Sequence, residues 1–205
     1  MADVEPGSWK GMRVLSVGHS THPIGEFLGL LASEGVSVVA DVRTVPRSRH
    51  NPQFERKALE ESLRGAGIRY VHLPRLGGLR KPRPGSANGA WRNASFRGYA
   101  DYMQTLEFEE GLSELRALAA SGTVAVMCAE AVPWRCHRSL VADALLARGA
   151  TPEHIVGRGP VEPHRLTPFA KVADERVTYP APASPASLAA ARTRRHTPSQ
   201  EPKDP

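Results

Sequence analysis

The chain has 205 residues, 40% of them hydrophobic, which suits one well-buried core better than two domains. It contains no run of about 18 apolar residues and no basic-then-apolar leader, so we expect a cytoplasmic protein without a membrane span. The net charge of +6 fits an anionic partner, although a global excess of this kind also serves solubility alone.

The first part of the chain alternates strand-like and helix-like patterns. Residues 13–17 form a short apolar run that ends at Gly18, and helical spacing follows, with Thr21 or His22 as its cap and Gly35 as its end. The next expected elements are a β-branched strand at 36–40, a helix at 52–64 and a strand at 68–73.

The second part begins with a long loop. Residues 74–94 are rich in Gly, Pro and Arg without periodicity, which favours a binding flap. The next expected elements are a helical stretch from Ser95 to residue 119 broken near Gly111, a strand at 123–127, a helix after 133–135 that ends at Gly149, and a short strand at 153–156.

This alternation predicts an α/β fold: a single Rossmann-like domain with a mostly parallel sheet of about five strands and flanking helices. We place the domain at residues 13–180, after an N-terminal extension (1–12) and before a disordered tail of Pro, Ala, Ser and Arg (181–205). A strand order of 3-2-1-4-5 would put the first and fourth strands beside the crevice in which such sheets bind ligands.

The first strand ends in Gly18-His19-Ser20-Thr21. This loop places an imidazole and two hydroxyls at a helix N-terminus, where free N–H groups favour an anion. A tight turn with an exposed histidine is the alternative.

The second strand ends in a loop with one acid and three arginines, from Asp41 to Arg49. Arginine presents a planar fork that suits phosphate or carboxylate, and we expect Arg47 and Arg49 to face solvent or a ligand. Asp41 and Arg43 can also pair with each other as a purely structural ion pair.

The fourth strand leads to both cysteines, Cys128 and Cys136. Cys136 lies near a helix N-terminus beside His137 and Arg138, which predicts a depressed pKa and thiolate character. Buried packing is the alternative for both cysteines. Glu130 can serve as a general base, a metal ligand or the partner of an arginine.

Two further features bear on partners. Residues 71–100 contain no acid and six positive charges, which equals the whole net charge and suggests a nucleic acid or a phosphorylated small molecule. The side chains of His19, Cys128, Cys136 and His137 are also suitable ligands for iron, zinc or haem, although neither CxxC nor HxxxH spacing is present.

Several of these motifs together resemble the family named domain of unknown function 488 (DUF488). The matching motifs, in chain order, are Val17 to Thr21, Asp41-Val42-Arg43 with Pro46 and Ser48, Leu73 to Leu79, Phe96 to Tyr102, Cys128-Ala129-Glu130 with Cys136-His137-Arg138, and His164 to Phe169. The resemblance covers about residues 13 to 180, and it implies which residues form the site but no reaction.

Three functions stay open: an enzyme acting on a nucleic acid, nucleotide or other phosphorylated ligand at the carboxyl ends of the strands; a non-catalytic nucleic-acid-binding module with Trp91, Phe96 and Tyr99 as stacking platforms; and a metal- or haem-binding protein. The catalytic candidates are His19, Asp41, Glu130, Cys136 and His137. The ligand-binding candidates are Ser20, Thr21, Arg43, Arg47, Ser48, Arg80 and Arg138. The sequence names no cofactor and no oligomeric state.

Overall fold

The computed structural model describes residues 8–182. Its strands are β1 (Arg13–Gly18), β2 (Val38–Asp41), β3 (Arg69–His72), β4 (Val124–Cys128), β5 (Thr151–Ile155), β6 (Glu162–Pro163), β7 (Lys171–Ala173) and β8 (Arg176–Thr178). Its α-helices are α1 (Ile24–Ser33), α2 (Arg56–Gly65), α3 (Ala94–Tyr102), α4 (Leu106–Ser121) and α5 (Arg138–Ala147). Three short 3₁₀ helices are η1 (Pro52–Phe54), η2 (Pro74–Leu76) and η3 (Pro133–Arg135).

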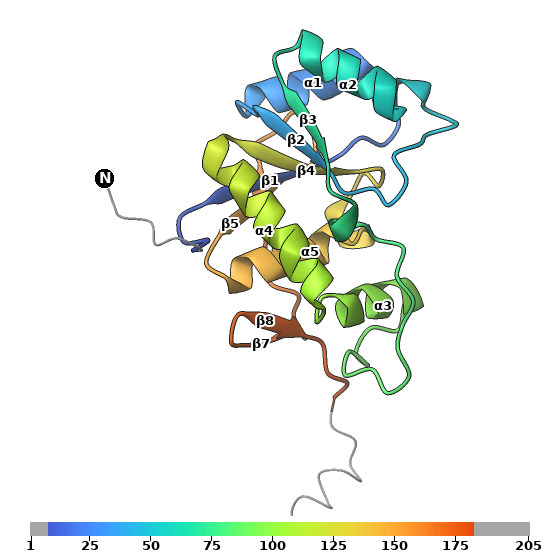
Figure 1. Ribbon diagram of the computed structural model, residues 1–205, viewed down its shortest axis with the longest axis vertical. Helices are drawn as coiled ribbons and strands as arrows, with labels where there is room; N and C mark the ends of the chain where they lie inside the picture. The colour runs from blue at the N-terminus through green and yellow to red at the C-terminus, as the bar shows by residue number, and fades with distance from the viewer. Residues whose placement is uncertain (1–7, 183–205) are drawn as a thin grey trace, which may run out of the picture.

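Six strands form the main sheet, in the order β3-β2-β4-β1-β5-β6. The first five are parallel, and β6 pairs antiparallel with β5. The Rossmann-like α/β fold is therefore confirmed (Figure 1). The expected order 3-2-1-4-5 is wrong, because β4 lies between β2 and β1 and pairs with both.

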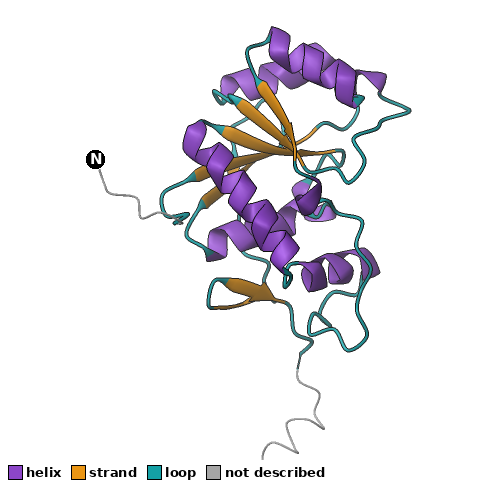
Figure 2. Cartoon of the chain, viewed as in Figure 1, coloured by secondary structure: helices purple, strands orange, loops and turns teal. Residues whose placement is uncertain are grey.

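Helices cover both faces of this sheet (Figures 1 and 2). The face with Val39 and Met127 packs against α1 and α2, while the face with Val38 and Val126 packs against α3, α4 and α5. Successive side chains of a strand point to opposite faces, so each buried strand contributes to both cores. This sidedness decides where the side chains at the strand ends go.

Several expected boundaries need correction. Neither Thr21 nor His22 caps α1, whose first residue instead follows Pro23. The Asn93 side chain, and not Ser95, caps α3 by accepting from the backbone N–H groups of Ser95 and Phe96. The long helical stretch breaks after Tyr102 rather than near Gly111, because a new cap at Thr105 starts α4.

The loop expected to be a binding flap is pinned to the domain. The Asp101 carboxylate accepts hydrogen bonds from the Arg83 backbone, the Ser86 hydroxyl and the Asn88 amide at 2.5–2.8 Å. Asn88 is itself buried and accepts from the backbone of Tyr179, just after the β7–β8 hairpin. We therefore describe residues 74–94 as an anchored loop.

The two ends of the chain differ in what the structure describes. Within the expected N-terminal extension, Trp9 is buried in the core, and the expected disordered tail lies outside the described residues from 183 onward. No helix in the described part of the chain combines the length and apolarity needed to cross a membrane.

Candidate functional site

Both cysteines lie at the carboxyl end of the sheet. Cys128 is the last residue of β4, and Cys136 lies between η3 and α5. Both are free thiols, and Cys136 is buried. Each of three residues, Cys128, Cys136 and His137, offers one donor atom, and these three atoms lie within 4.8 Å of one another.

The two sulfurs share one proton unequally. Their mutual hydrogen bond is the largest cause that raises the pKa of Cys128 well above its ordinary value of 9.0 and lowers the pKa of Cys136 to about 3. The His137 ring, 3.7 Å from Cys136 Sγ, and the charge of Arg138 lower the pKa of Cys136 further. These interactions favour the thiolate form of Cys136, with Cys128 as the protonated partner.

Arg138 fixes this arrangement from the first residue of α5. Arg138 is 1% exposed, and its guanidinium donates to the backbone carbonyls of Glu130 and Ala131 and lies 3.5 Å from Cys136 Sγ. Gly18 makes the arrangement possible, because a Cβ there would collide with the backbone of Glu130 and Ala131. Arg138 is thus a positioning residue for the loop after β4 and not a free ligand-binding group.

A cavity of about 330 Å³ opens in front of the cysteines. It is lined by Arg43, Thr44, Val45, Arg47, Gly78, Leu79, Ser95, Phe96, Cys128, Ala129, Glu130, Arg135, Cys136 and His137. Arg47 and Arg135 are exposed, and within residues 8–182 neither forms an ion pair. The half-buried Glu130 carboxylate likewise has no hydrogen-bond partner in that range, so all three groups are available to a ligand.

Asp41, in contrast, is fully used by the fold. Arg43 donates to both carboxylate oxygens at 2.6–3.1 Å, and the Tyr70 hydroxyl donates to Oδ2 at 2.8 Å. Asp41 has no exposed surface and lies on the α1/α2 side of the sheet, whereas Cys128 lies on the α3/α5 side. The expected pairing of Asp41 with Arg43 is thus present, and Arg43 borders the cavity with its charge already neutralised.

His19 belongs to the same closed group as Asp41. Its Nδ1 lies 2.9 Å from the Ser20 carbonyl oxygen and its Nε2 lies 3.4 Å from Arg43, so both ring nitrogens have partners. The ring stacks on Phe54 at 4.2 Å between centroids. Burial is the largest cause that lowers the pKa of His19 to about 4, so the ring is neutral at pH 7.

The remaining ligand-binding candidates lie outside the cavity lining. Ser20 adopts a positive φ of 44° with its N–H on Ala129, and Thr21 is exposed. Ser48 donates its N–H to Glu55. The Arg80 guanidinium lies 3.6 Å above the Tyr102 ring and donates to backbone carbonyls of the anchored loop. Arg43, Arg47, Glu130, Cys136 and His137 line the cavity together; Asp41, His19 and Arg138 contact members of this group from outside the lining, and Ser20, Thr21, Ser48 and Arg80 lie outside it.

The cluster has part of the donor set of a metal site. Two cysteine sulfurs and one imidazole are donors that zinc prefers; a structural zinc site has a fourth protein ligand, whereas a catalytic zinc site has three protein ligands and an open position. Among residues 8–182, no fourth His, Cys, Asp or Glu donor joins these three. His19, expected as a further ligand, has both nitrogens engaged elsewhere.

A family model described as domain of unknown function DUF488 matches residues 23–145, which is more than half of the chain. The chain belongs to the DUF488 family. No curated protein and no solved structure matches it. The DUF488 match contains both cysteines, Glu130 and the cavity arginines, but it ends before the closing motif from His164 to Phe169.

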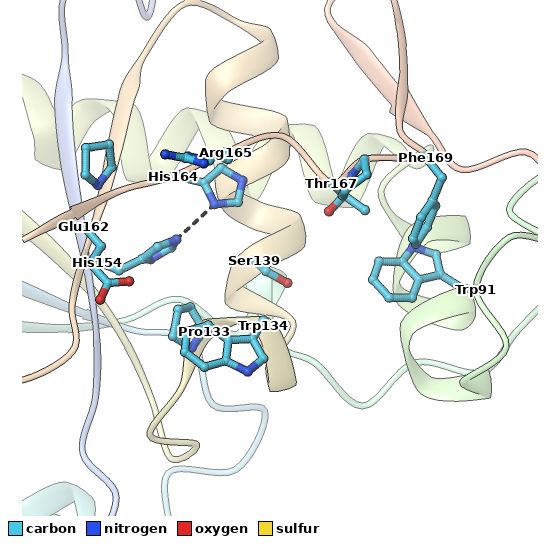
Figure 3. A pocket seen from close by; sticks show the side chains of 12 residues that line it. Trp91, Pro133, Trp134, Ser139, His154, Glu162, His164, Arg165, Thr167 and Phe169 are labelled. Carbon is cyan, nitrogen blue, oxygen red and sulfur yellow. Dashed lines mark hydrogen bonds between the residues drawn. The ribbon is translucent and has the colours of Figure 1, made fainter.

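That closing motif belongs to a buried network that sequence reasoning did not assign. Ser16 Oγ lies 2.7 Å from His154 Nδ1, His154 Nε2 lies 3.0 Å from His164 Nδ1, and His164 Nε2 lies 2.8 Å from Asp143 Oδ1 (Figure 3 shows the central contact). Asp143 also accepts from the N–H and hydroxyl of Thr167 and from the Tyr179 hydroxyl. The available signal was two histidines ten positions apart, His154 and His164.

Proposed function

We propose that this DUF488 protein is an enzyme that uses the Cys136 thiolate as a nucleophile on a phosphorylated ligand. The observation that carries the proposal is a buried thiolate on the wall of a cavity that also presents two unpaired arginines, Arg47 and Arg135. Parallel α/β sheets place ligands at the carboxyl ends of their strands, and this cavity lies at the ends of β2 and β4.

The proposed chemistry is redox-neutral group transfer. Cys136 Sγ donates an electron pair to the electrophilic atom of the ligand, forming a sulfur bond as the bond to the leaving group breaks. The leaving group departs with that bond's electron pair and takes one proton from Glu130, the carboxyl group that lines the cavity. Water then attacks the covalent intermediate, gives its proton to Glu130, and restores the thiolate.

Charge favours an anionic ligand over a neutral one. Arg43 and Arg138 hold the loops through internal contacts, whereas Arg47 and Arg135 have no ion-pair partner within residues 8–182. An arginine fork suits the oxygens of a phosphate. A phosphate bound by these two groups would lie in the same cavity as Cys136 Sγ.

A non-catalytic nucleic-acid-binding module is less well supported. Arg75 pairs with Glu110 and Glu114, and Arg80 stacks on Tyr102, so two of the six charges of the basic stretch are used internally. Tyr99 is fully buried and is not a stacking platform.

Alkylation of Cys136 tests the proposal directly. The rate constant for iodoacetamide should stay nearly flat from about pH 5 to 8, whereas an ordinary thiol would react about tenfold faster per pH unit. Inorganic phosphate should protect Cys136. Arg47→Gln and Arg135→Gln should each raise the phosphate concentration for half-protection at least about threefold, and Arg92→Gln, an exposed control outside the cavity, should not.

Two results would overturn the proposal. The first is that phosphate does not protect Cys136 at any concentration, or that it protects Cys136 in Arg47→Gln and Arg135→Gln as well as in the unmodified protein. The other is a stoichiometric metal in purified protein, found by elemental analysis, whose removal is required before Cys136 reacts. Cys136→Ser identifies the alkylated site by mass spectrometry.

A further inference from the structure

A second, larger cavity of about 610 Å³ lies next to the first, between α5 and the segment that follows β5. Figure 3 shows its walls, with His154 and His164 on one side, Trp134 below, and Trp91 with Phe169 on the other side. Cavities of this size are typical of small-molecule sites, and nothing in the proposed chemistry uses this one.

The walls of this cavity combine aromatic ring faces with the exposed charged side chains of Glu162 and Arg165 and the indole N–H of Trp91, which is unpaired within residues 8–182. With both imidazoles neutral and His164 Nε2 donating its hydrogen bond to Asp143, His164 Nδ1 accepts from His154 Nε2 and His154 Nδ1 accepts from the Ser16 hydroxyl. All four ring nitrogens are thus engaged within the network. Trp91 and Phe169 pack edge to face at 4.9 Å, and the Trp134 side chain is 62% exposed.

The walls of the second cavity and of the Cys136 cavity adjoin at two places. In η3, Pro133 and Trp134 line the second cavity while Arg135 lines the first. Across the gap, Phe96 of the first cavity stacks on Trp91 of the second at 4.7 Å. The two cavities are therefore neighbours, separated by η3 and by the stacked Trp91 and Phe96 side chains.

We infer that the second cavity binds the base of a nucleotide whose phosphate lies in the Cys136 cavity, either as a free nucleotide or at the end of a nucleic-acid strand. This inference rests on the proposed function for the phosphate, and on the aromatic walls for the base. A flat, polar π-system stacks well on indole and imidazole faces, and a sugar joins base to phosphate across η3. Arg165, exposed at the cavity, adds positive charge for a second phosphate or a strand backbone.

Ligand protection of Cys136 tests the inference, first with a nucleotide and a sugar phosphate. Adenosine 5′-monophosphate should protect at a concentration at least about fivefold lower than ribose 5-phosphate, because stacking adds to phosphate binding. Trp134→Ala should remove that difference while leaving ribose 5-phosphate unchanged, and Trp134→Phe should restore most of it. Leu106→Ala, an exposed apolar residue away from both cavities, serves as the control. Because Trp134 is largely exposed, its loss should not unfold the protein.

The outcomes separate this inference from the proposed function. Ribose 5-phosphate protecting as well as the nucleotide would overturn the base site alone. Adenosine quenching Trp134 fluorescence, with no protection by ribose 5-phosphate, would support the base site and overturn the phosphate chemistry. No binding of any probe would overturn both. If a 5′-phosphorylated oligonucleotide protects Cys136 at a lower concentration than the mononucleotide does, the ligand is the end of a nucleic-acid strand rather than a free nucleotide.

Discussion

Two carboxylates of this domain, Asp143 and Glu130, have opposite surroundings. Asp143 accepts hydrogen bonds from His164, Thr167 and Tyr179 and has no exposed surface. Glu130 is half-buried on a cavity wall and has no partner within residues 8–182. A carboxylate whose lone pairs are all used stabilises the fold, while one left without partners is free to act on a ligand.

The same contrast divides the other titratable residues. Asp41 and His19 share their polar atoms with Arg43, Tyr70 and the backbone, like the Asp143 network. Cys136 shares its charge with Cys128 and still borders a cavity. Residue type alone therefore does not separate the closed networks from the open site.

The largest effect on stability should come from opening the Asp143 network. In Asp143→Asn an amide NH₂ replaces one carboxylate oxygen, so some of the groups that donate to Asp143 lose their acceptor. We therefore expect the free energy of unfolding to fall by about 3 kcal/mol. In a chain of this size that lowers Tm by about 6–12 °C, measurable by calorimetry. Asp174→Asn, in the exposed β7–β8 turn, is the matched control. A loss below about 1 kcal/mol would mean that the network is not a stabilising one.

The next effect should come from pH, through the two buried histidines. Burial is the largest cause that lowers the pKa of both His19 and His154 to about 4, from 6.5. Between these values the unfolded chain binds protons that the folded chain does not, so stability falls as pH falls from about 6.5 to 4. Each histidine contributes up to about 3 kcal/mol to this loss.

Urea unfolding at pH 7.5 and pH 4.5 measures this difference. His19→Gln should reduce it by up to half, whereas His50→Gln, at an exposed position, should leave it unchanged. A pH difference that His19→Gln does not alter would show that the imidazole of His19 is not buried in solution.

Most of the fold could be predicted because its signals are local. Short apolar runs and helical spacing predicted β1 to β4 and α1, α2 and α5 within a few residues. Strand order could not be predicted. The alternation of strands and helices shows that the strands are joined by crossovers, but it does not show between which two strands the next one inserts. In the structure β4 lies between β2 and β1. The β7–β8 hairpin carries few buried residues and gave no pattern to find.

The site was predicted only in part, for a reason visible in the strands. Asp41 and Cys128 both end strands that pair with each other, which suggested one site. Side chains two positions apart in a strand point to the same face, so Asp41 shares the face of Val39, and Cys128 shares the face of Val126. These are opposite faces of the sheet. The Asp143 network joins residues from five separate segments, and side-chain contacts of that kind are not encoded in any local spacing.

The smallest effect on stability should come from Glu130→Gln, which makes the same chemical change as Asp143→Asn at the open site. Because Glu130 has no partner within residues 8–182, we expect the free energy of unfolding to change by no more than about 0.5 kcal/mol. The proposed reaction uses Glu130 in its protonated form, so Glu130→Gln should leave the phosphate concentration that half-protects Cys136 nearly unchanged, and the loss of the proton donor should slow turnover of a phosphate ester about a hundredfold. Denaturant unfolding and the protection assay on one preparation measure the first two effects. If Glu130→Gln destabilised the protein as much as Asp143→Asn, the two carboxylates would have the same role, and Glu130 would belong to the fold rather than to the reaction.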